Sequence, residues 1–216
     1  MITVEIWSDF VCPFCYIGKR RFEAALERFP QKDDVHVVWK SFQLDPRANH
    51  AAGTGVVDVL AAKYGRPREW ALEMTGQVTR MAAGDGLIYS MEGAIPANTF
   101  DAHRLSHLAA KSQLQGKAEE LIFAAYFTEG KNIGDTETLL ELARGIGLDG
   151  GETARLLAGD AFTDEVRKDE NEATRLGIAA VPCFVVNRAQ TITGAQPVER
   201  LLDALKNAAK EPSTVR

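Results

Sequence analysis

The chain has 216 residues, more than one small domain needs and fewer than two full domains usually take. Its net charge is −5 and it has no lysine/arginine cluster, so nothing in the sequence favours binding to nucleic acid or to an anionic membrane. No run of about 18 apolar residues predicts a membrane span. We therefore expect a globular protein with neither a nucleic acid nor a membrane as partner.

The N-terminal residues predict a β-α-β unit. Apolar residues alternate with others over residues 2–7, which is typical of a strand. A helix is expected from Cys12 to Phe29, because its apolar residues fall mostly at helical spacing. A second strand, rich in β-branched and aromatic residues, is expected from Val35 to Leu44.

A small-residue linker, His50 to Gly55, follows, and then helices dominate. Asp135 and Gly150-Gly151 are expected to cap or stop these helices. Helices are predicted at Val56–Tyr64, Pro67–Ala83, Pro96–Ser112, Lys117–Thr128, Asp135–Ile146, Glu152–Ala158 and Phe162–Leu176. The last part predicts a β-hairpin, Val181–Asn187 with Thr191–Gly194, then a helix, Pro197–Ala209, and a frayed tail after Lys210.

The pair Cys12 and Cys15 has two main interpretations, a redox dithiol or half of a zinc site. A zinc site would need a second tight pair of ligands. The remaining candidates are Cys183, His36, His50, His103 and His107. Only the last two lie close in sequence, and two ordinary surface or half-buried histidines explain them more simply. We therefore predict no metal.

The redox interpretation fits the position of the pair. Cys12 lies at the predicted start of a helix, where free N–H groups and the helix dipole favour a thiolate. Cys15 lies one turn inward and should be more shielded, and Pro13 suits an early helical position. We therefore expect Cys12 to attack a disulfide and Cys15 to resolve the mixed disulfide. Two buried structural cysteines are the alternative.

The first residues also bear on the compartment. The chain starts directly with a predicted strand, without a basic region or an apolar stretch of signal-peptide length. This favours a cytoplasmic protein, where structural disulfides seldom persist. Three cysteines, two of them as C-x-x-C, therefore indicate redox or metal chemistry rather than structural disulfide bonds.

Three segments in register resemble the DsbA family, and its FrnE-like subgroup in particular. They are Ser8–Gly18, which carries the Cys-Pro-Phe-Cys motif, Asn98–Arg104, and Gly177–Pro182 with Thr193–Pro197. The resemblance implies an α/β protein: a thioredoxin-like fold with a large all-helical insertion domain. We place the discontinuous thioredoxin-like domain at residues 1–48 plus 162–216, and the insertion at residues 49–161.

The resemblance also implies substrate-binding residues. In this family a cis-proline loop faces the dithiol and accepts the substrate chain, which assigns that role to Val181 and Pro182, beside Pro13 and Phe14. Periplasmic DsbA oxidants carry histidine where Phe14 stands, and phenylalanine cannot stabilise a thiolate as that histidine does. A strongly oxidising potential is therefore not expected.

Candidate supporting residues are less firmly placed. Asp9 could accept a proton during resolution, as could Glu5, although capping of the first helix is the preferred role for Asp9. Asn98 and His103, with their neighbours Thr99 and Arg104, are expected to cap a helix and line its face towards the dithiol, or to be purely structural. Cys183 is either a small buried filler or a third thiol within reach of the dithiol.

The leading function is a thiol–disulfide oxidoreductase that acts on disulfides or thiols of proteins or small molecules. The alternative, drawn from the same fold family, is a 2-hydroxychromene-2-carboxylate isomerase or another glutathione-dependent enzyme, which usually carries serine in place of Cys12. The third possible function is that of a non-catalytic module that binds a partner or a metal ion. No cofactor is expected beyond the redox-active pair, with glutathione as a candidate co-substrate. The sequence predicts neither a physiological substrate nor an oligomeric state.

Overall fold

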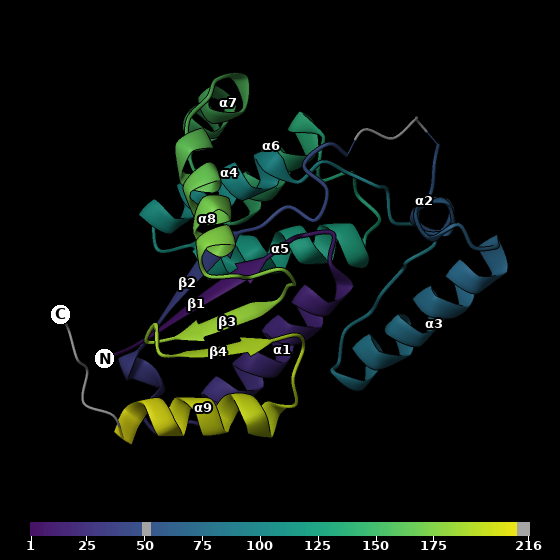
Figure 1. Ribbon diagram of the computed structural model, residues 1–216. Coiled ribbons are helices and arrows are strands. Elements are labelled where there is room, and N and C mark those ends of the chain that lie inside the picture. The colour runs from purple at the N-terminus through teal and green to yellow at the C-terminus, as the bar shows by residue number, and fades with distance from the viewer. Residues whose placement is uncertain (49–52, 211–216) are drawn as a thin grey trace.

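The structure is a computed structural model that describes residues 1–48 and 53–210. Its centre is a four-stranded mixed sheet in the order β2-β1-β3-β4 (Figure 1). The strands are β1 (Ile2–Ser8), β2 (Val35–Ser41), β3 (Cys183–Val186) and β4 (Gln190–Thr193). β1 pairs in parallel with β2 and antiparallel with β3, and β3 pairs antiparallel with β4. The predicted β-α-β opening and the late hairpin are thereby confirmed.

Helices cover both faces of the sheet. On one face lie α1 (Pro13–Glu27) and α9 (Val198–Lys210), which pack on the inward side chains of β1, such as Val4 and Ile6. The other face carries the helical insertion, and Trp7 of β1 packs there with both active-site cysteines. The alternation of β1 therefore divides the core into two layers, one on each face of the sheet.

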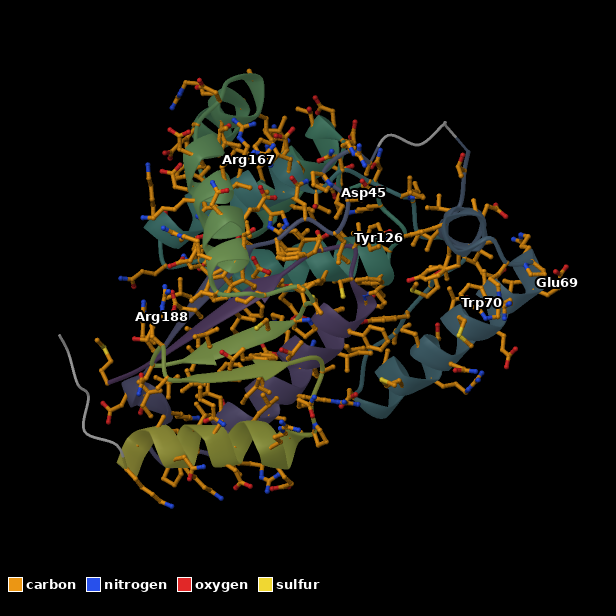
Figure 2. All side chains as sticks on the ribbon, viewed as in Figure 1. Asp45, Glu69, Trp70, Tyr126, Arg167 and Arg188 are labelled. Carbon is orange, nitrogen blue, oxygen red and sulfur yellow. The ribbon has the colours of Figure 1, made fainter. Side chains whose placement is uncertain are left out.

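The insertion contains two groups of helices. α2 and α3 form a hairpin at one side of the molecule, and the other helices gather over the sheet (Figure 1). α5 contributes a buried aromatic cluster: Phe123, Tyr126 and Phe127 are nearly inaccessible, and Figure 2 shows side chains crowding the space beside Tyr126. The bounds are α2 Val56–Tyr64, α3 Arg68–Gly84, α4 Phe100–Lys111, α5 Gln115–Phe127, α6 Thr136–Gly145, α7 Gly150–Ala158 and α8 Thr163–Arg175.

Several predicted boundaries were wrong, and at each of them a backbone amide bonds to a polar side chain. β2 ends at Ser41 rather than Leu44, because the Leu44 amide donates to the carboxylate of Asp9 and the chain turns away. α4 starts at Phe100 rather than Pro96, and the Asn98 side chain accepts from the Phe100 amide just before it. Gly150 and Gly151 do not stop a helix but begin α7, which Asp149 caps.

Other boundaries and caps agree with the sequence. Asp135 caps α6 by accepting from the Thr138 amide, as predicted. Part of the predicted linker, residues 49–52 with the zinc candidate His50, and the predicted frayed tail, residues 211–216, lie outside the described residues.

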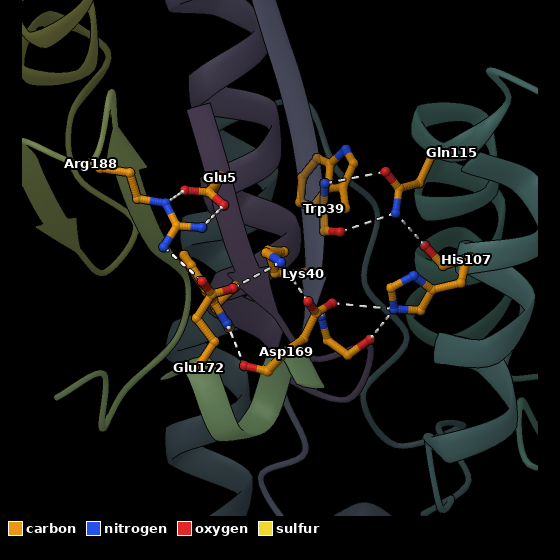
Figure 3. Close-up of polar contacts among 11 residues, drawn as sticks. Glu5, Trp39, Lys40, His107, Gln115, Asp169, Glu172 and Arg188 are labelled. Carbon is orange, nitrogen blue, oxygen red and sulfur yellow. Dashed lines mark hydrogen bonds and ion pairs between the residues drawn. The ribbon is translucent and has the colours of Figure 1, made fainter. Parts of the chain in front are cut away.

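A buried carboxylate joins α8 to the sheet and to the insertion (Figure 3). Asp169 of α8 accepts from the Lys40 ammonium at 2.6 Å and from the Ser41 amide at 3.0 Å, both on β2. The Nε2 atom of His107 on α4 lies 3.2 Å from the same carboxylate. Burial by itself would raise the pKa of Asp169, but the hydrogen bonds from His107 and Lys40 hold it below its usual value.

The edge of β2 is closed by a side chain. Gln115, at the start of α5, accepts from the Trp39 amide at 3.3 Å and donates to the Trp39 carbonyl at 3.1 Å (Figure 3). These are the two groups that a neighbouring strand would bond, so the amide of Gln115 takes the place of a strand at this point of the edge.

Both connections between the sheet and the insertion are fastened at the start of α4. The Asn98 amide group donates to the Pro46 carbonyl, on the segment that leaves the sheet. The Arg104 guanidinium donates to the carbonyls of Gly159 at 2.7 Å and Ala161 at 2.8 Å, on the segment that returns to it. It also bonds the Leu156 carbonyl, so Arg104 caps the end of α7 as well.

Candidate functional site

The dithiol lies where β1 passes into α1. Cys12 is the N-cap residue of α1 and Pro13 its first residue, as the sequence predicts. A tight turn precedes the helix: the Cys12 amide donates to the Asp9 carbonyl at 3.0 Å, and the Cys15 amide donates to the Cys12 carbonyl at 3.0 Å. Both cysteines are free and buried, and Cys15 is completely inaccessible.

Burial separates the two thiols chemically. Burial raises the pKa of the Cys15 thiol well above its usual value. The hydrogen bond between Cys15 and the Cys12 sulfur, and the nearby charge of Cys12, raise the pKa of Cys15 further. The Asp9 amide and the Ser8 hydroxyl face the Cys15 sulfur and lower its pKa, but by less. Cys15 is therefore a protonated thiol at neutral pH.

The predicted cis-proline loop faces the dithiol. The Val181–Pro182 peptide bond is cis, and the Sγ atom of Cys12 lies 3.6 Å from the Val181 carbonyl oxygen. The same loop rests on α1 at Gly18: a Cβ atom at that position would lie 2.7 Å from Pro182 Cγ. The glycine therefore allows the loop to approach the helix at the height of the dithiol.

The insertion also reaches the motif. The Tyr89 hydroxyl, from the segment between α3 and α4, donates to the Pro13 carbonyl at 2.7 Å. Burial raises the pKa of Tyr89 above its usual value, so the phenol stays protonated and can donate. Phe14, in contrast, is 39% exposed beside Cys12 and presents an apolar surface to the solvent.

Asp9 does not cap α1, which corrects the preferred prediction. Cys12 is the N-cap, and no side chain caps that end. The Asp9 carboxylate points the other way: Oδ2 accepts from the Leu44 amide at 2.7 Å, and Oδ1 lies 3.4 Å from Nε2 of His103. Glu5 forms an ion pair with Arg188 at the β3–β4 turn instead of approaching the dithiol (Figure 3).

The residues of the segment Asn98–Arg104 make different kinds of contact. His103 is buried, and its ring lies 4.8 Å from that of Phe10 in the turn before Cys12. Thr99 is the N-cap residue of α4 and makes no capping bond through its side chain. Asn98 and Arg104 bind the two connections described above, so these two residues support the structure rather than line the site.

Of the two histidines predicted to be surface or half-buried, His107 is half-buried and His103 is buried, and each contacts a buried carboxylate: Asp169 for His107 and Asp9 for His103. Within residues 1–48 and 53–210, no three histidine, cysteine or acidic side chains gather as metal ligands. Cys183 is the first residue of β3 and fully buried, with its sulfur 4.0 Å from the Thr193 hydroxyl. Burial raises the pKa of Cys183, which fits the role of a small filler.

Three contacts of the site were missed at the level of sequence. Ser8 and Gly18 stand at the two ends of the segment that carries the motif, so proximity could have indicated them. Tyr89 carries no such signal, since it lies more than 70 residues away from the motif and is brought to it by the fold.

The whole chain was compared with known proteins. The model of the DSBA-like thioredoxin domain family matches residues 3–206. The chain belongs to this family. Its fold is accordingly the DsbA-like thioredoxin fold with a helical insertion, as the sequence predicted. No described helix of this DSBA-like domain is both long and apolar enough to cross a membrane.

Individual proteins with a similar sequence or structure agree with this family assignment. The crystal structure of a probable DsbA oxidoreductase from Streptomyces coelicolor is 41% identical with a TM-score of 0.93, covering 100% of this chain and 93% of that one. An uncharacterised protein, YwbO of Bacillus subtilis, is 28% identical over 86% of both chains. Two structures share the fold at lower identity. The cytosolic disulfide reductase DsbM of Pseudomonas aeruginosa with GSH has a TM-score of 0.63 and 20% identity, covering 97% of this chain and 100% of that one. A 2-hydroxychromene-2-carboxylate isomerase has a TM-score of 0.68 and 16% identity, with the same coverage.

Proposed function

We propose that this DSBA-like domain is a thiol–disulfide oxidoreductase of the FrnE type, with Cys12 as nucleophile and Cys15 as resolving thiol. The observation that carries the proposal is the placement of the pair. Cys12 stands at the N-terminus of α1 with its sulfur 3.6 Å from the Val181 carbonyl, while Cys15 is buried one turn inward.

The reaction would run in two steps. The Cys12 thiolate attacks one sulfur of a substrate disulfide, a Cys12–substrate disulfide forms, and the other substrate sulfur leaves as a thiolate. Cys15 then loses its proton and attacks the Cys12 sulfur, which releases the second substrate thiolate and leaves a Cys12–Cys15 disulfide. The high pKa of Cys15 keeps this thiol protonated, so that Cys12 makes the first attack.

The walls of the site suggest how a substrate is held. The Val181–Pro182 loop offers backbone groups next to the Cys12 sulfur, and Pro13 and the half-exposed Phe14 offer an apolar contact on the other side. Phe14 carries no charge that would favour the thiolate form of Cys12. This supports a redox potential for the Cys12–Cys15 pair that is only weakly oxidising. The pair would then act as a reductase or an isomerase rather than as a strong oxidant.

We place the protein in the cytoplasm, where glutathione is a candidate reductant of the Cys12–Cys15 disulfide. The cysteine usage of the chain, three residues of which two form the C-x-x-C pair, fits that compartment. The fold likeness to DsbM, named as a cytosolic reductase and crystallised with GSH, adds support.

The test is insulin reduction by dithiothreitol. Cys12→Ser should abolish catalysis, Cys15→Ser should accumulate mixed disulfides visible by mass spectrometry, and the matched change Cys183→Ala should leave the rate unchanged. Full turnover by the Cys12 variant would refute the proposal. A disulfide to Cys183 after mild oxidation would instead give this third thiol a redox role.

The isomerase-like alternative makes the opposite prediction. Enzymes of that type do not need a dithiol, so glutathione-dependent isomerisation of 2-hydroxychromene-2-carboxylate should survive in the Cys15→Ser variant. The presence of Cys12, where those enzymes usually carry serine, is the observation against it.

A further inference from the structure

The connection that follows β4 is fastened to the cis-proline loop. Cys183 pairs with Thr193 in the β3–β4 hairpin, so the residues just outside this pair, Pro182 and Gly194, come together. The Gly194 amide donates to the Pro182 carbonyl at 2.7 Å. A shift of the chain after Gly194 would therefore also move Val181 and Pro182, to which the proposed function assigns substrate binding.

Both segments lie against one face of α1. Gly18 lies under the loop, because a Cβ atom at this position would be 2.7 Å from Pro182 Cγ. Arg21 follows three residues later and therefore lies on the same face of the helix. Its Nη1 atom donates to the Ala195 carbonyl at 2.6 Å, on the connection from β4 to α9 that passes beside α1 (Figure 1). α1 thus contacts the cis-proline loop directly through Gly18 and indirectly through Arg21.

The other edge of the Arg21 guanidinium is held by the helical insertion. Its Nε atom lies 3.0 Å from both carboxylate oxygens of Asp85 and donates to them, and its Nη2 atom lies 2.8 Å from Oδ2. The side chains of Arg21 and Asp85 are only 19% and 17% exposed. A forked contact between guanidinium and carboxylate is strong and fixes the orientation of the arginine. The ion pair therefore directs Nη1 towards Ala195.

Asp85 is itself fixed at the end of α3. It is the C-cap residue of this helix, and the amides of Gly86 and Leu87 after it bond back to carbonyls of the last helical turn. With Gly86 at a φ of 76° and Leu87 buried, this is a Schellman motif. A carboxylate at the C-terminus of a helix is unfavourable, because it lies beside the negative end of the helix dipole. The charge of Asp85 therefore serves its contact with Arg21 rather than α3.

We propose that Arg21 and Asp85 form a clamp by which the helical insertion holds the Val181–Pro182 loop in position to bind the substrate chain. From Asp85 the route runs through Arg21 to the connection after β4, and from there to Pro182. Arg21 acts through the loop and is thus a positioning residue. The inference rests on the proposed function.

Two disulfides that share one leaving group test the clamp. Ellman's reagent joins two thionitrobenzoate groups, and the second substrate joins one thionitrobenzoate to the cysteine of a short peptide. The reduced Cys183→Ala protein converts either disulfide to two thiols while Cys12 and Cys15 become a disulfide, and the absorbance of thionitrobenzoate reports the rate. Only the peptide has a backbone for the Val181–Pro182 loop to bind. A defect of the loop should therefore appear mainly with the peptide.

Arg21→Lys keeps the charge but loses the fork, because an ammonium group cannot hold Asp85 at two points and reach the Ala195 carbonyl as well. We expect this variant to raise the peptide concentration that gives the half-maximal rate about tenfold, and to change the maximal rate and the rate with Ellman's reagent by less than about threefold. Asp85→Asn should raise the half-maximal concentration about threefold. The double variant should be no worse than Arg21→Lys, because the two residues act as one unit.

Arg28→Lys is the matched control. Arg28 lies on the same helix and also forms a forked ion pair, with Glu199 of α9, but at exposed positions. This variant should behave as the parent with both substrates. Far-UV circular dichroism checks folding, and Asp85→Asn alone suffices for the test if Arg21→Lys does not fold.

The outcomes are distinct. An unchanged half-maximal concentration of the peptide in Arg21→Lys would overturn the clamp, and so would equal losses with both substrates, since these would mean that the dithiol itself is disturbed. A parent that reacts with Ellman's reagent but shows no saturation with the peptide would overturn it as well. If the parent releases no thionitrobenzoate from either substrate, the proposed function itself fails and this inference falls with it.

Discussion

Pro182 lies close to Gly18, and this contact predicts the effect of a Gly18→Ala change, in which a destabilising clash competes with the greater helix propensity of alanine. In Gly18→Ala the new Cβ atom would stand 2.7 Å from Pro182 Cγ, whereas carbon atoms pack best at about 3.5–4.0 Å. The loop must therefore move by about 1 Å. Overpacking of this kind costs about 1–3 kcal/mol, while alanine gains about 0.5–1 kcal/mol over glycine inside a helix.

The net expectation is a loss of about 1–2 kcal/mol in the free energy of unfolding, measured by urea denaturation. The insulin reduction rate should fall as well, by as much as about 10²-fold, because the Val181 carbonyl shifts relative to the Cys12 sulfur. Gly76→Ala is the matched control. Gly76 also lies within a helix, α3, and its new Cβ would meet only the end of the Arg80 side chain, at 3.5 Å.

The control should therefore gain about 0.5–1 kcal/mol and keep full activity. If Gly18→Ala stabilises the protein as much as Gly76→Ala does and reduces insulin at the parent rate, the glycine is not what admits the loop, and the reasoning is refuted.

Two buried carboxyls predict opposite dependences of stability on pH. Burial raises the pKa of Glu119 to about 7. Between pH 4.5 and pH 7 the unfolded chain releases a proton that the folded chain keeps, so the free energy of unfolding should fall by about 3 kcal/mol. Glu119→Gln, which can still accept a hydrogen bond from Ser106, should abolish this fall. The lowered pKa of Asp169 contributes stability that is present above the ordinary aspartate range and lost as the pH falls through it. Asp169→Asn, which leaves His107 without its charged partner and Lys40 with Glu172 alone, should cost about 1.5–3 kcal/mol at pH 7.

Urea denaturation at a series of pH values checks both. Glu165→Gln and Asp164→Asn, at exposed positions of α8, are matched controls and should change stability by less than about 0.5 kcal/mol at any pH. A Glu119→Gln variant that retains the fall, or an Asp169→Asn variant as stable as its control, would contradict the respective prediction.

Local signals predicted most of the architecture. The alternation in β1, the proline after Cys12 and the bounds of α2 follow from neighbouring residues, and the structure agrees with them. The failures come from contacts over long sequence distances. Asp9 resembles a helix cap when read locally, but its carboxylate binds the Leu44 amide and faces His103 of the insertion. No periodicity encodes such partners.

The same limit applies to the candidate site. The dithiol could be predicted from its own motif, whereas the Val181–Pro182 loop was predicted only through the resemblance to the DsbA family. Arg104 belongs to such a motif too, yet its guanidinium binds backbone carbonyls of a segment more than 50 residues away. Which atoms an arginine contacts depends on the path of the chain, and the motif does not contain that path.

The attachment of both connections to the start of α4 has an evolutionary consequence. Asn98 holds the outgoing segment and Arg104 the returning one, so seven residues fix where the helical insertion joins the sheet. Helices beyond that point can be lengthened, exchanged or reshaped without moving the two points of attachment. A lineage could thus alter the surface that surrounds the dithiol, and with it the choice of substrate, while the β-strands and the cysteines stay as they are.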